Sequence, residues 1–289
     1  MIPVKHALTI DVEDWYHVEN LRRAIPPERW SGMDARLDGN VDRLLALFSE
    51  RCVKATFFVL GAAAERHPGV VRRIAAAGHE VASHGWSHDL IYRQEKETFR
   101  SETRRSKALL EDLCGQSVDG YRASTFSITE RSLWALDILA EEGFSYDSSI
   151  APLRHDRYGI PTAPARPHLR ELKSGRTLAE FPVSFFRVLG WRFPIGGGFF
   201  RLFPLRSMVK GLGQYAARGV PGGIYLHPWE IDPDQPRVDG LPLLPRFRHY
   251  VGLSRTHAKL ERLLRAVEFT TMRAALAAAF PEVGAGAER

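Results

Sequence analysis

The sequence predicts an α/β protein built around a parallel β-sheet, and three observations carry that prediction. Short apolar segments of strand length alternate along the chain with amphipathic segments of helix length. The segment over residues 55–60 is apolar without interruption, which is typical of a strand buried on both faces. Polar residues close several of the apolar segments, as they do at the carboxyl ends of barrel strands. Strands that alternate with helices form βα units, whose strands run parallel.

In the first half of the chain, residue types at the helix ends support each element in turn. Asn40 is expected to cap the first helix. Gly78 stops the second helix, and Gly115 lies just beyond the end of the third. Thr129, together with Ser132, starts the fourth helix. The strands are expected over residues 6–12, 55–60, 79–84, 118–122 and 144–149, and the helices over 41–48, 68–77, 95–114 and 129–142.

From about residue 150 the composition changes. Residues 151–168 are rich in Pro and Arg and are expected to form a long loop. Residues 196–203 combine three glycines with three phenylalanines, without the strand–loop–helix spacing of a phosphate-binding loop. We expect them to form a mobile flap, with rigid packing on the barrel as the alternative. Further strands are expected over 178–183, 223–227 and near 269, and helices over 204–217 and from 254 onward.

Composition narrows the functional class. The 289 residues are 44% hydrophobic and 26% charged, as in a soluble globular protein. The net charge of +6 comes from arginines spread along the chain, which favours a basic enzyme over a nucleic-acid-binding protein. An anionic substrate or peripheral contact with an anionic membrane stays open. No signal peptide and no membrane-spanning segment is visible, so a cytoplasmic location is expected.

Polar side chains follow five of the predicted strands. His84 and His88 are four residues apart, a spacing that lets two imidazoles bind one metal ion. Because the carboxyl ends of parallel barrel strands meet at one face, all five groups are expected to lie together. The groups are Asp11 with Glu13 and Asp14, His84 with His88, Arg122, Asp147, and His227.

This set of side chains fits amide hydrolysis at a metal ion. Two histidines and one carboxylate leave an open position on a metal for water and for a carbonyl oxygen. A free carboxylate can then accept the proton of the water, and an acid on the opposite side can protonate the departing nitrogen. An arginine beside the base would fix and charge-stabilise that carboxylate.

Five ordered motifs in the chain resemble those of NodB-type polysaccharide deacetylases, carbohydrate esterase family 4. Two C-terminal segments, 227–237 and 248–253, further resemble the subfamily encoded in exopolysaccharide loci of exosortase/PEP-CTERM bacteria. The resemblance covers nearly the whole chain. The five motifs are Thr9-Ile-Asp11-Val-Glu-Asp14, Ser83-His84-Gly-Trp-Ser-His88, Tyr121-Arg122-Ala-Ser-Thr-Phe126, Tyr146-Asp147-Ser-Ser and Ile224-Tyr-Leu-His227.

The resemblance implies a distorted (β/α)7 barrel formed by a single domain over residues 1–289. In that domain, 1–150 would be the core half, and 151–283 would complete the barrel with subfamily-specific loops. It implies Asp11 as the catalytic base, Arg122 as the residue that orients the base, and His227 as the general acid.

Metal binding and substrate binding also follow from the resemblance. His84 and His88 are implied as metal ligands, with zinc as the expected metal and cobalt or nickel as alternatives. The family's usual Asp-Asp pair is replaced here by Asp11-Val-Glu13-Asp14. Asp14 has the usual residue type and is taken as the third ligand, while Glu13, on the same side of the strand as Asp11, is the alternative. The expected substrate-binding residues are Trp229, Tyr121, Asp147, Phe199 and Phe200.

The expected function is therefore metal-dependent removal of acetyl groups from N-acetylhexosamine units. The expected substrate is an exopolysaccharide or its oligosaccharide precursor, including a lipid-linked form. One alternative is a hydrolase of small cyclic amides, like the allantoinases, which can lack the metal. Another is a catalytically dead carbohydrate-binding module, but a complete set of base, ligands and acid argues against it.

Overall fold

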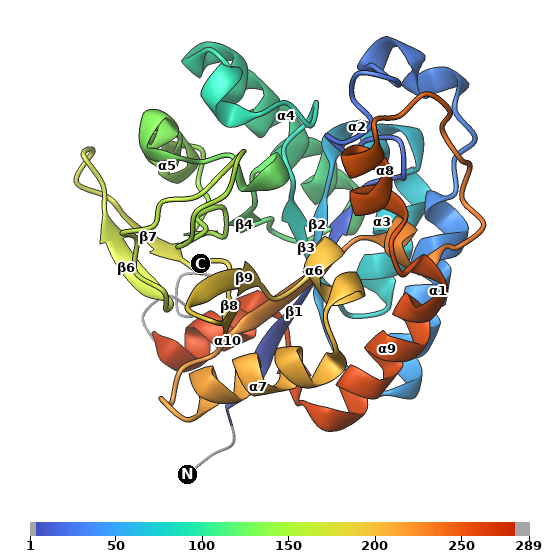
Figure 1. Ribbon diagram of the computed structural model, residues 1–289. Coiled ribbons are helices and arrows are strands. Elements are labelled where there is room, and N and C mark those ends of the chain that lie inside the picture. Colours follow the sequence, from blue (N-terminus) through green and yellow to red (C-terminus); the bar gives the residue numbers. More distant parts are fainter. Residues whose placement is uncertain (1–3, 281–289) are drawn as a thin grey trace.

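A curved sheet of parallel strands forms the centre of the computed structural model (Figure 1). The strand order is β10-β1-β2-β3-β4-β5-β7-β6, and β6 is the antiparallel member at the edge. This arrangement confirms the predicted α/β fold of the distorted-barrel type. The parallel strands are β1 (His6–Val12), β2 (Thr56–Val59), β3 (Glu80–Ser83), β4 (Gly120–Tyr121), β5 (Tyr146–Asp147), β7 (Thr177–Glu180) and β10 (Gly223–Leu226).

Helices cover the outer face of the sheet, as Figure 1 shows. Every residue of β1 is buried, because this strand has parallel partners on both sides, β2 and β10, and helices cover the sheet. The helices are α1 (Leu37–Glu50), α2 (Gly61–Arg66), α3 (Pro68–Ala76), α4 (Lys96–Cys114), α5 (Trp134–Glu141), α6 (Gly197–Leu202), α7 (Leu205–Ala216), α8 (Leu243–Tyr250), α9 (Leu253–Ala266) and α10 (Met272–Ala279).

The barrel is distorted because β7 and β10 do not pair with each other. Side chains and a short bridge fill the gap between them. The Ser184 hydroxyl accepts a hydrogen bond from the Gly223 amide at 2.9 Å, and the Phe181 ring packs against Gly223. Gly196 forms an isolated parallel bridge to Tyr225 of β10. The chain after β7 therefore completes the wall of the barrel.

Several elements of the structure were not predicted from the sequence. They include the antiparallel strand β6 (His168–Glu171) and the hairpin of β8 (Phe185–Val188) and β9 (Trp191–Pro194). Helix α8 follows Pro242 and contains a second proline, so its segment looked like a loop. Helix α10 and the pairing of β11 (Phe269–Thr270) with β1 extend the predicted C-terminal elements.

The structure describes residues 4–280. Residues 1–3, at the start of the segment expected to contain no signal peptide, and residues 281–283 of the expected C-terminal half lie outside that range. Among the described residues, no helix is both long enough and apolar enough to cross a bilayer.

One buried histidine predicts acid sensitivity of the fold. His79 accepts the Ala55 amide hydrogen at Nδ1, 3.1 Å away, and its burial lowers the pKa of the imidazole to about 4. Between pH 6.5 and 4 the unfolded chain binds a proton at this ring and the folded chain does not, so stability falls as the pH drops. We expect the free energy of unfolding, measured by urea titration, to fall by about 2 kcal/mol more between pH 7 and 4.5 in the wild type than in His79→Gln. Equal pH dependence in the two proteins would contradict this assignment.

Candidate active site

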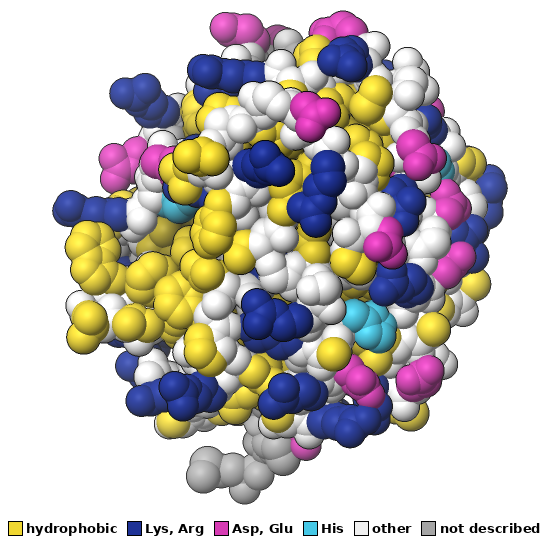
Figure 2. All heavy atoms as spheres, turned by 45° about the vertical axis from the view of Figure 1, so that its right-hand side comes forward, with side chains coloured by type: hydrophobic (Ala, Val, Ile, Leu, Met, Phe, Trp, Pro, Cys, Tyr) yellow, Lys and Arg dark blue, Asp and Glu magenta, His cyan; other side chains and the backbone are white. Residues whose placement is uncertain are grey.

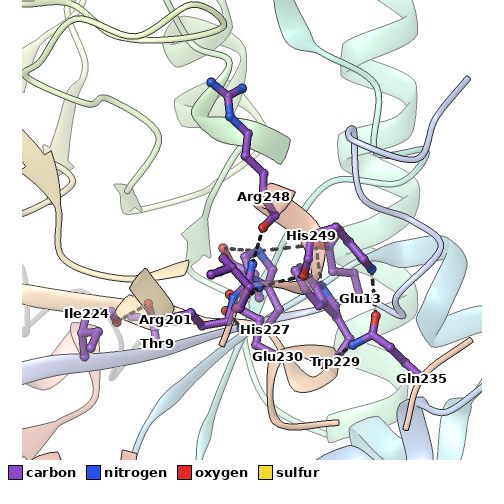
Figure 3. Close-up of polar contacts among 12 residues, drawn as sticks. Thr9, Glu13, Arg201, Ile224, His227, Trp229, Glu230, Gln235, Arg248 and His249 are labelled. Carbon is purple, nitrogen blue, oxygen red and sulfur yellow. Dashed lines mark hydrogen bonds and ion pairs between the residues drawn. The ribbon is translucent and has the colours of Figure 1, made fainter. Parts of the chain in front are cut away.

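The carboxyl ends of the parallel strands open into a cavity of about 360 Å³. Strands β1 and β10 and the loop after β3 supply its polar lining, while segments after residue 150 supply most of the apolar wall. Figure 3 shows part of this cluster, with Glu13, His227 and Trp229 close together. The predicted residues that line the cavity are Asp11, Glu13, His84, His88, Phe199, His227 and Trp229.

Glu13, His84 and His88 form a compact group of metal-ligand type. One ligand atom from each side chain lies within 4.8 Å of the other two, and all three side chains are buried. His88 Nε2 is 2.7 Å from a Glu13 carboxylate oxygen. His84 donates through Nδ1 to the Arg122 carbonyl at 2.8 Å, which leaves its Nε2 free for a ligand. The backbone turn is set by Gly85 and His88, both with positive φ.

The protonation states of this group also suit a divalent cation. Burial lowers the pKa of His84 to about 4, so its imidazole is neutral at pH 7. Burial alone would raise the pKa of Glu13, but the neighbouring His88, with contributions from His227 and His84, holds it well below its usual range. A neutral imidazole and an ionised carboxylate are the forms that bind metals. The donor set therefore fits a metal such as zinc.

Asp14 is not brought to the histidines, which corrects its assignment as the third ligand. Its carboxylate accepts hydrogen bonds from the backbone amides of Trp15, Arg36 and Leu37, at 2.9, 2.8 and 3.1 Å. The last two amides belong to the start of α1, so Asp14 satisfies the free donors at that helix N-terminus. The expected cap, Asn40, instead lies inside α1 and donates to Asp232. Strand parity favoured Glu13, and Glu13 is the carboxylate that lies beside the two histidines.

Asp11 is held by Arg122 beside the metal-ligand group. An Asp11 carboxylate oxygen accepts from Arg122 Nη1 at 2.6 Å, and the same nitrogen donates to Thr9 Oγ1 at 2.8 Å. The other end of the guanidinium donates to the hydroxyl and carbonyl oxygens of Ser148. Arg122 also lies over the ring of Phe58, 4.1 Å from its centroid. This buried network fixes Asp11 in one orientation, as a positioned base requires.

His227 faces Asp11 and Glu13 from the end of β10. Its Nε2 lies 3.9 Å from an Asp11 oxygen and 3.4 Å from a Glu13 oxygen. On the other side of the ring, Nδ1 lies 3.0 Å from a Glu230 oxygen. Burial alone would lower the pKa of His227, but Glu230, with Glu13 and Asp11, raises it to about 9. The ring therefore carries a proton near neutral pH, as a general acid must.

Glu230 and Arg201 are functional candidates that the sequence analysis missed. Arg201 Nε donates to Glu230 at 2.7 Å, and its Nη atoms donate to the carbonyls of Arg248, His249 and Val251. Figure 3 shows this cluster around His227. Glu230 comes three residues after His227, a spacing that could have indicated a partner for the histidine. Arg201 carried no such signal, since its contact is made only by the fold.

The expected substrate-binding residues divide into two groups. Trp229 and Phe199 line the cavity, with Trp229 stacked between His227 and His249. Tyr121, Asp147 and Phe200 are buried away from it, which corrects their assignment. Tyr121 and Phe200 belong to the hydrophobic core, and Asp147 accepts hydrogen bonds from the Ser149 amide and hydroxyl.

The glycine-rich segment is packed against β10, so the expected flap is corrected in favour of the rigid alternative. Gly196 has φ of 147°, and a Cβ atom there would lie 2.3 Å from the Tyr225 carbonyl oxygen. Gly197, with φ of 50°, would meet the Tyr225 ring at 2.8 Å. The glycines are needed for close approach between two segments, not for a hinge.

This packing predicts opposite outcomes for two glycines in the same segment. Gly196→Ala is expected to lower stability by about 3 kcal/mol or more, because both the backbone conformation and the contact with Tyr225 forbid a side chain. Gly198→Ala is the matched control: its Cβ would meet only ordinary contacts, the nearest 3.6 Å away. Thermal melts of both variants check this. Similar melting temperatures for the two variants would instead favour the interpretation of this segment as a mobile flap.

In comparisons with known protein families, the two halves of the chain match two different families. Residues 31–143 match the polysaccharide deacetylase family, and residues 148–277 match a domain of unknown function, DUF3473. The first match includes His84, His88 and Arg122, and the second includes His227. Asp11 and Glu13 lie before both.

The curated relatives are deacetylases. The chain is 29% identical to a peptidoglycan-N-acetylglucosamine deacetylase of Bacillus cereus, over 37% of this chain and 43% of the relative. It is 33% identical to a peptidoglycan deacetylase of Helicobacter pylori, over 38% and 36% of the two chains. A chitooligosaccharide deacetylase of Rhizobium leguminosarum is 32% identical over 34% and 43%. The aligned segments thus span less than half the length of these relatives.

Solved structures share the fold. A peptidoglycan N-acetylglucosamine deacetylase superposes with a TM-score of 0.52 at 18% identity, over 95% of this chain and 88% of the other. The PuuE allantoinase gives a TM-score of 0.60 at 18% identity, over 95% and 89%. At such identities the likeness concerns the fold alone, which both deacetylases and an allantoinase adopt.

Proposed function

Since residues 31–143 carry the polysaccharide deacetylase domain and the curated relatives are deacetylases, we propose that this chain is a metal-dependent N-deacetylase. It hydrolyses the acetamide of N-acetylhexosamine units in a polysaccharide or its oligosaccharide precursor. The observation that carries the proposal is the convergence of Glu13, His84 and His88 with Asp11 and His227 at one cavity.

Each residue of the site has a distinct part in this reaction. A divalent ion held by Glu13, His84 and His88 would supply Lewis-acid polarisation of the amide carbonyl and of the attacking water. Asp11 accepts the proton of that water, in the orientation that Arg122 fixes. His227 gives a proton to the departing nitrogen from the opposite side. Zinc is the expected ion, with cobalt or nickel as alternatives.

The cavity supports a sugar as substrate. Its wall is mostly apolar and aromatic, with Trp229, Phe199, Phe126 and Tyr158 around a few convergent polar groups. A flat apolar ring such as that of Phe199 suits the face of a pyranose, whereas both faces of Trp229 are covered by His227 and His249. We expect the acetamide of the sugar to meet Asp11, Glu13 and His227, which line the same cavity. We further propose an exopolysaccharide or its precursor as the substrate, and a cytoplasmic location for its modification.

The test is acetate release from a panel of N-acetylated oligosaccharides, measured before and after chelation and after return of zinc, cobalt or nickel. Release that chelator abolishes and metal restores is expected. Hydrolysis of allantoin or another cyclic amide, without release of acetate, would favour the allantoinase-like alternative. Glycan binding without any hydrolysis, in a protein loaded with metal, would favour a catalytically inactive binding module.

A further inference from the structure

Large hydrophobic side chains are exposed on one part of the molecule. Among residues 4–280, every large hydrophobic residue that is exposed, except Leu169, lies between positions 189 and 247. Leu189 is 95% exposed, Leu243 is 86% exposed and Trp191 is 70% exposed. Single exposed apolar residues are ordinary, but a contiguous group marks an interaction site. The group consists of Leu189, Trp191, Leu202, Leu243, Leu244 and Phe247, and we call it the apolar rim.

Leu189 is unfavourable in its position for two separate reasons. Val188 pairs with Trp191, so Leu189 and Gly190 form a two-residue hairpin turn. Both turn residues have positive φ, 48° and 84°, a conformation in which Asn, Asp or Gly is preferred to leucine. The side chain is also almost fully in water. A leucine that costs stability in the turn and exposes apolar surface indicates a contact outside the folded chain.

The segments that carry the apolar rim are joined to one another through α6. Phe193 of β9 packs on Phe199, which lies in α6, and on Phe203, which directly follows that helix. Arg201 of α6 donates to carbonyls at the end of α8, so α6 and α8 are held together. Leu202, Leu244 and Phe247 also line the active-site cavity, which places the rim at the cavity mouth. Figure 2 shows a broad hydrophobic area on the left of the turned face, with Lys and Arg side chains around it.

The surroundings of the apolar rim are basic. Residues 237–262, which include α8 and most of α9, hold six Lys or Arg and two Asp or Glu, a net charge of +4 out of +6 for the whole chain. Arg246 is exposed on α8, between Leu244 and Phe247. Exposed leucines and a tryptophan beside arginines are typical of segments that lie in the interface of an anionic membrane.

We propose that the apolar rim attaches the protein peripherally to an anionic lipid bilayer. Leu189, Trp191 and Leu243 insert among the acyl chains, and Arg246 with its basic neighbours contacts the phosphate headgroups. The positive charge around the rim favours an anionic bilayer over a second copy of the chain as its partner, because two positively charged faces would repel each other. If the proposed deacetylase function also holds, the attachment brings the cavity mouth to sugars carried on membrane lipids.

Leu189→Asn provides a sharp test, because asparagine suits the turn better than leucine. The purified protein is sedimented with vesicles of phosphatidylcholine alone and with vesicles containing phosphatidylglycerol. Wild-type protein is expected to bind the anionic vesicles, less so at high salt. Leu189→Asn is expected to bind roughly three- to tenfold more weakly and Leu189→Asn with Leu243→Ser more weakly still, with no loss of melting temperature from Leu189→Asn.

Leu169→Asn is the matched control, since Leu169 is exposed on β6, a strand that contributes no residue to the rim. It is expected to bind vesicles as the wild type does. Vesicle binding that is equal in wild type and Leu189→Asn would overturn the proposal. So would rim-dependent self-association in the absence of vesicles, or rim-dependent binding to soluble glycan but not to lipid. Acetate release from soluble oligosaccharide, assayed in parallel, reports separately on the proposed function.

Discussion

Replacing Glu13 with glutamine is expected to remove bound metal and turnover together. The carboxylate lies 2.7 Å from His88 Nε2 and within the ligand group that includes His84. A neutral amide is a poor ligand for a divalent ion, and even the outer partners of metal ligands are worth 10–100-fold in affinity. We therefore expect metal affinity and acetate release to fall by roughly two orders of magnitude or more. Metal analysis of the purified variant and titration with zinc measure the first loss, and the acetate assay measures the second.

Asp14→Asn is the matched control, because it removes the adjacent carboxylate without touching the histidines. Asp14 accepts three backbone amide hydrogens, two of them at the start of α1. An asparagine has one acceptor oxygen, so it cannot accept from Trp15 and from the two amides at the helix start at the same time. Stability is therefore expected to fall by about 1–2 kcal/mol while the metal stays bound. Loss of metal from Asp14→Asn, with full occupancy in Glu13→Gln, would reverse the assignment of the ligand.

The core of the fold could be predicted because its signals are local. An uninterrupted apolar segment such as 55–60 can be recognised without knowing its partners, and it became β2 between β1 and β3. The β8–β9 hairpin gave no such signal, because its turn has Leu189 where asparagine or glycine is expected. Helix α8 was not predicted because it contains Pro245, and proline usually indicates a loop. Pro245 lies in the first turn of the helix, where proline is tolerated.

In the candidate site too, the features set by local sequence could be predicted, and the contacts made only by the fold could not. The strand ends that carry Asp11, His84, Arg122 and His227 are fixed by the alternating pattern, so their convergence could be anticipated. Which of two adjacent carboxylates faces the histidines depends on where the chain turns after β1. Asp14 turns away because the start of α1 offers it free amide donors, a contact between positions about twenty residues apart. The salt bridge of Arg201 with Glu230 is likewise a product of the fold.

Asp11→Asn is expected to lower turnover by about 10²–10⁴-fold with the metal still bound. Asparagine has nearly the same shape and keeps an oxygen for the 2.6 Å contact with Arg122, but it cannot accept the proton of the attacking water. Asp11 is not in the ligand group, so metal occupancy is expected to equal that of the wild type. The loss should appear in kcat, with KM changed only a few-fold.

The control for Asp11→Asn is Asp147→Asn. Asp147 is a buried carboxylate at the end of another parallel strand, β5, but it does not line the cavity. This variant is expected to keep kcat within a few-fold of the wild type, because the carboxyl group bonds to Ser149 and to Glu180 of the adjacent strand β7, and not to a residue that lines the cavity. Comparable losses of kcat in both variants would mean that any buried charge at this edge of the sheet matters. A kcat for Asp11→Asn within tenfold of the wild type would show that another group accepts the proton of the water.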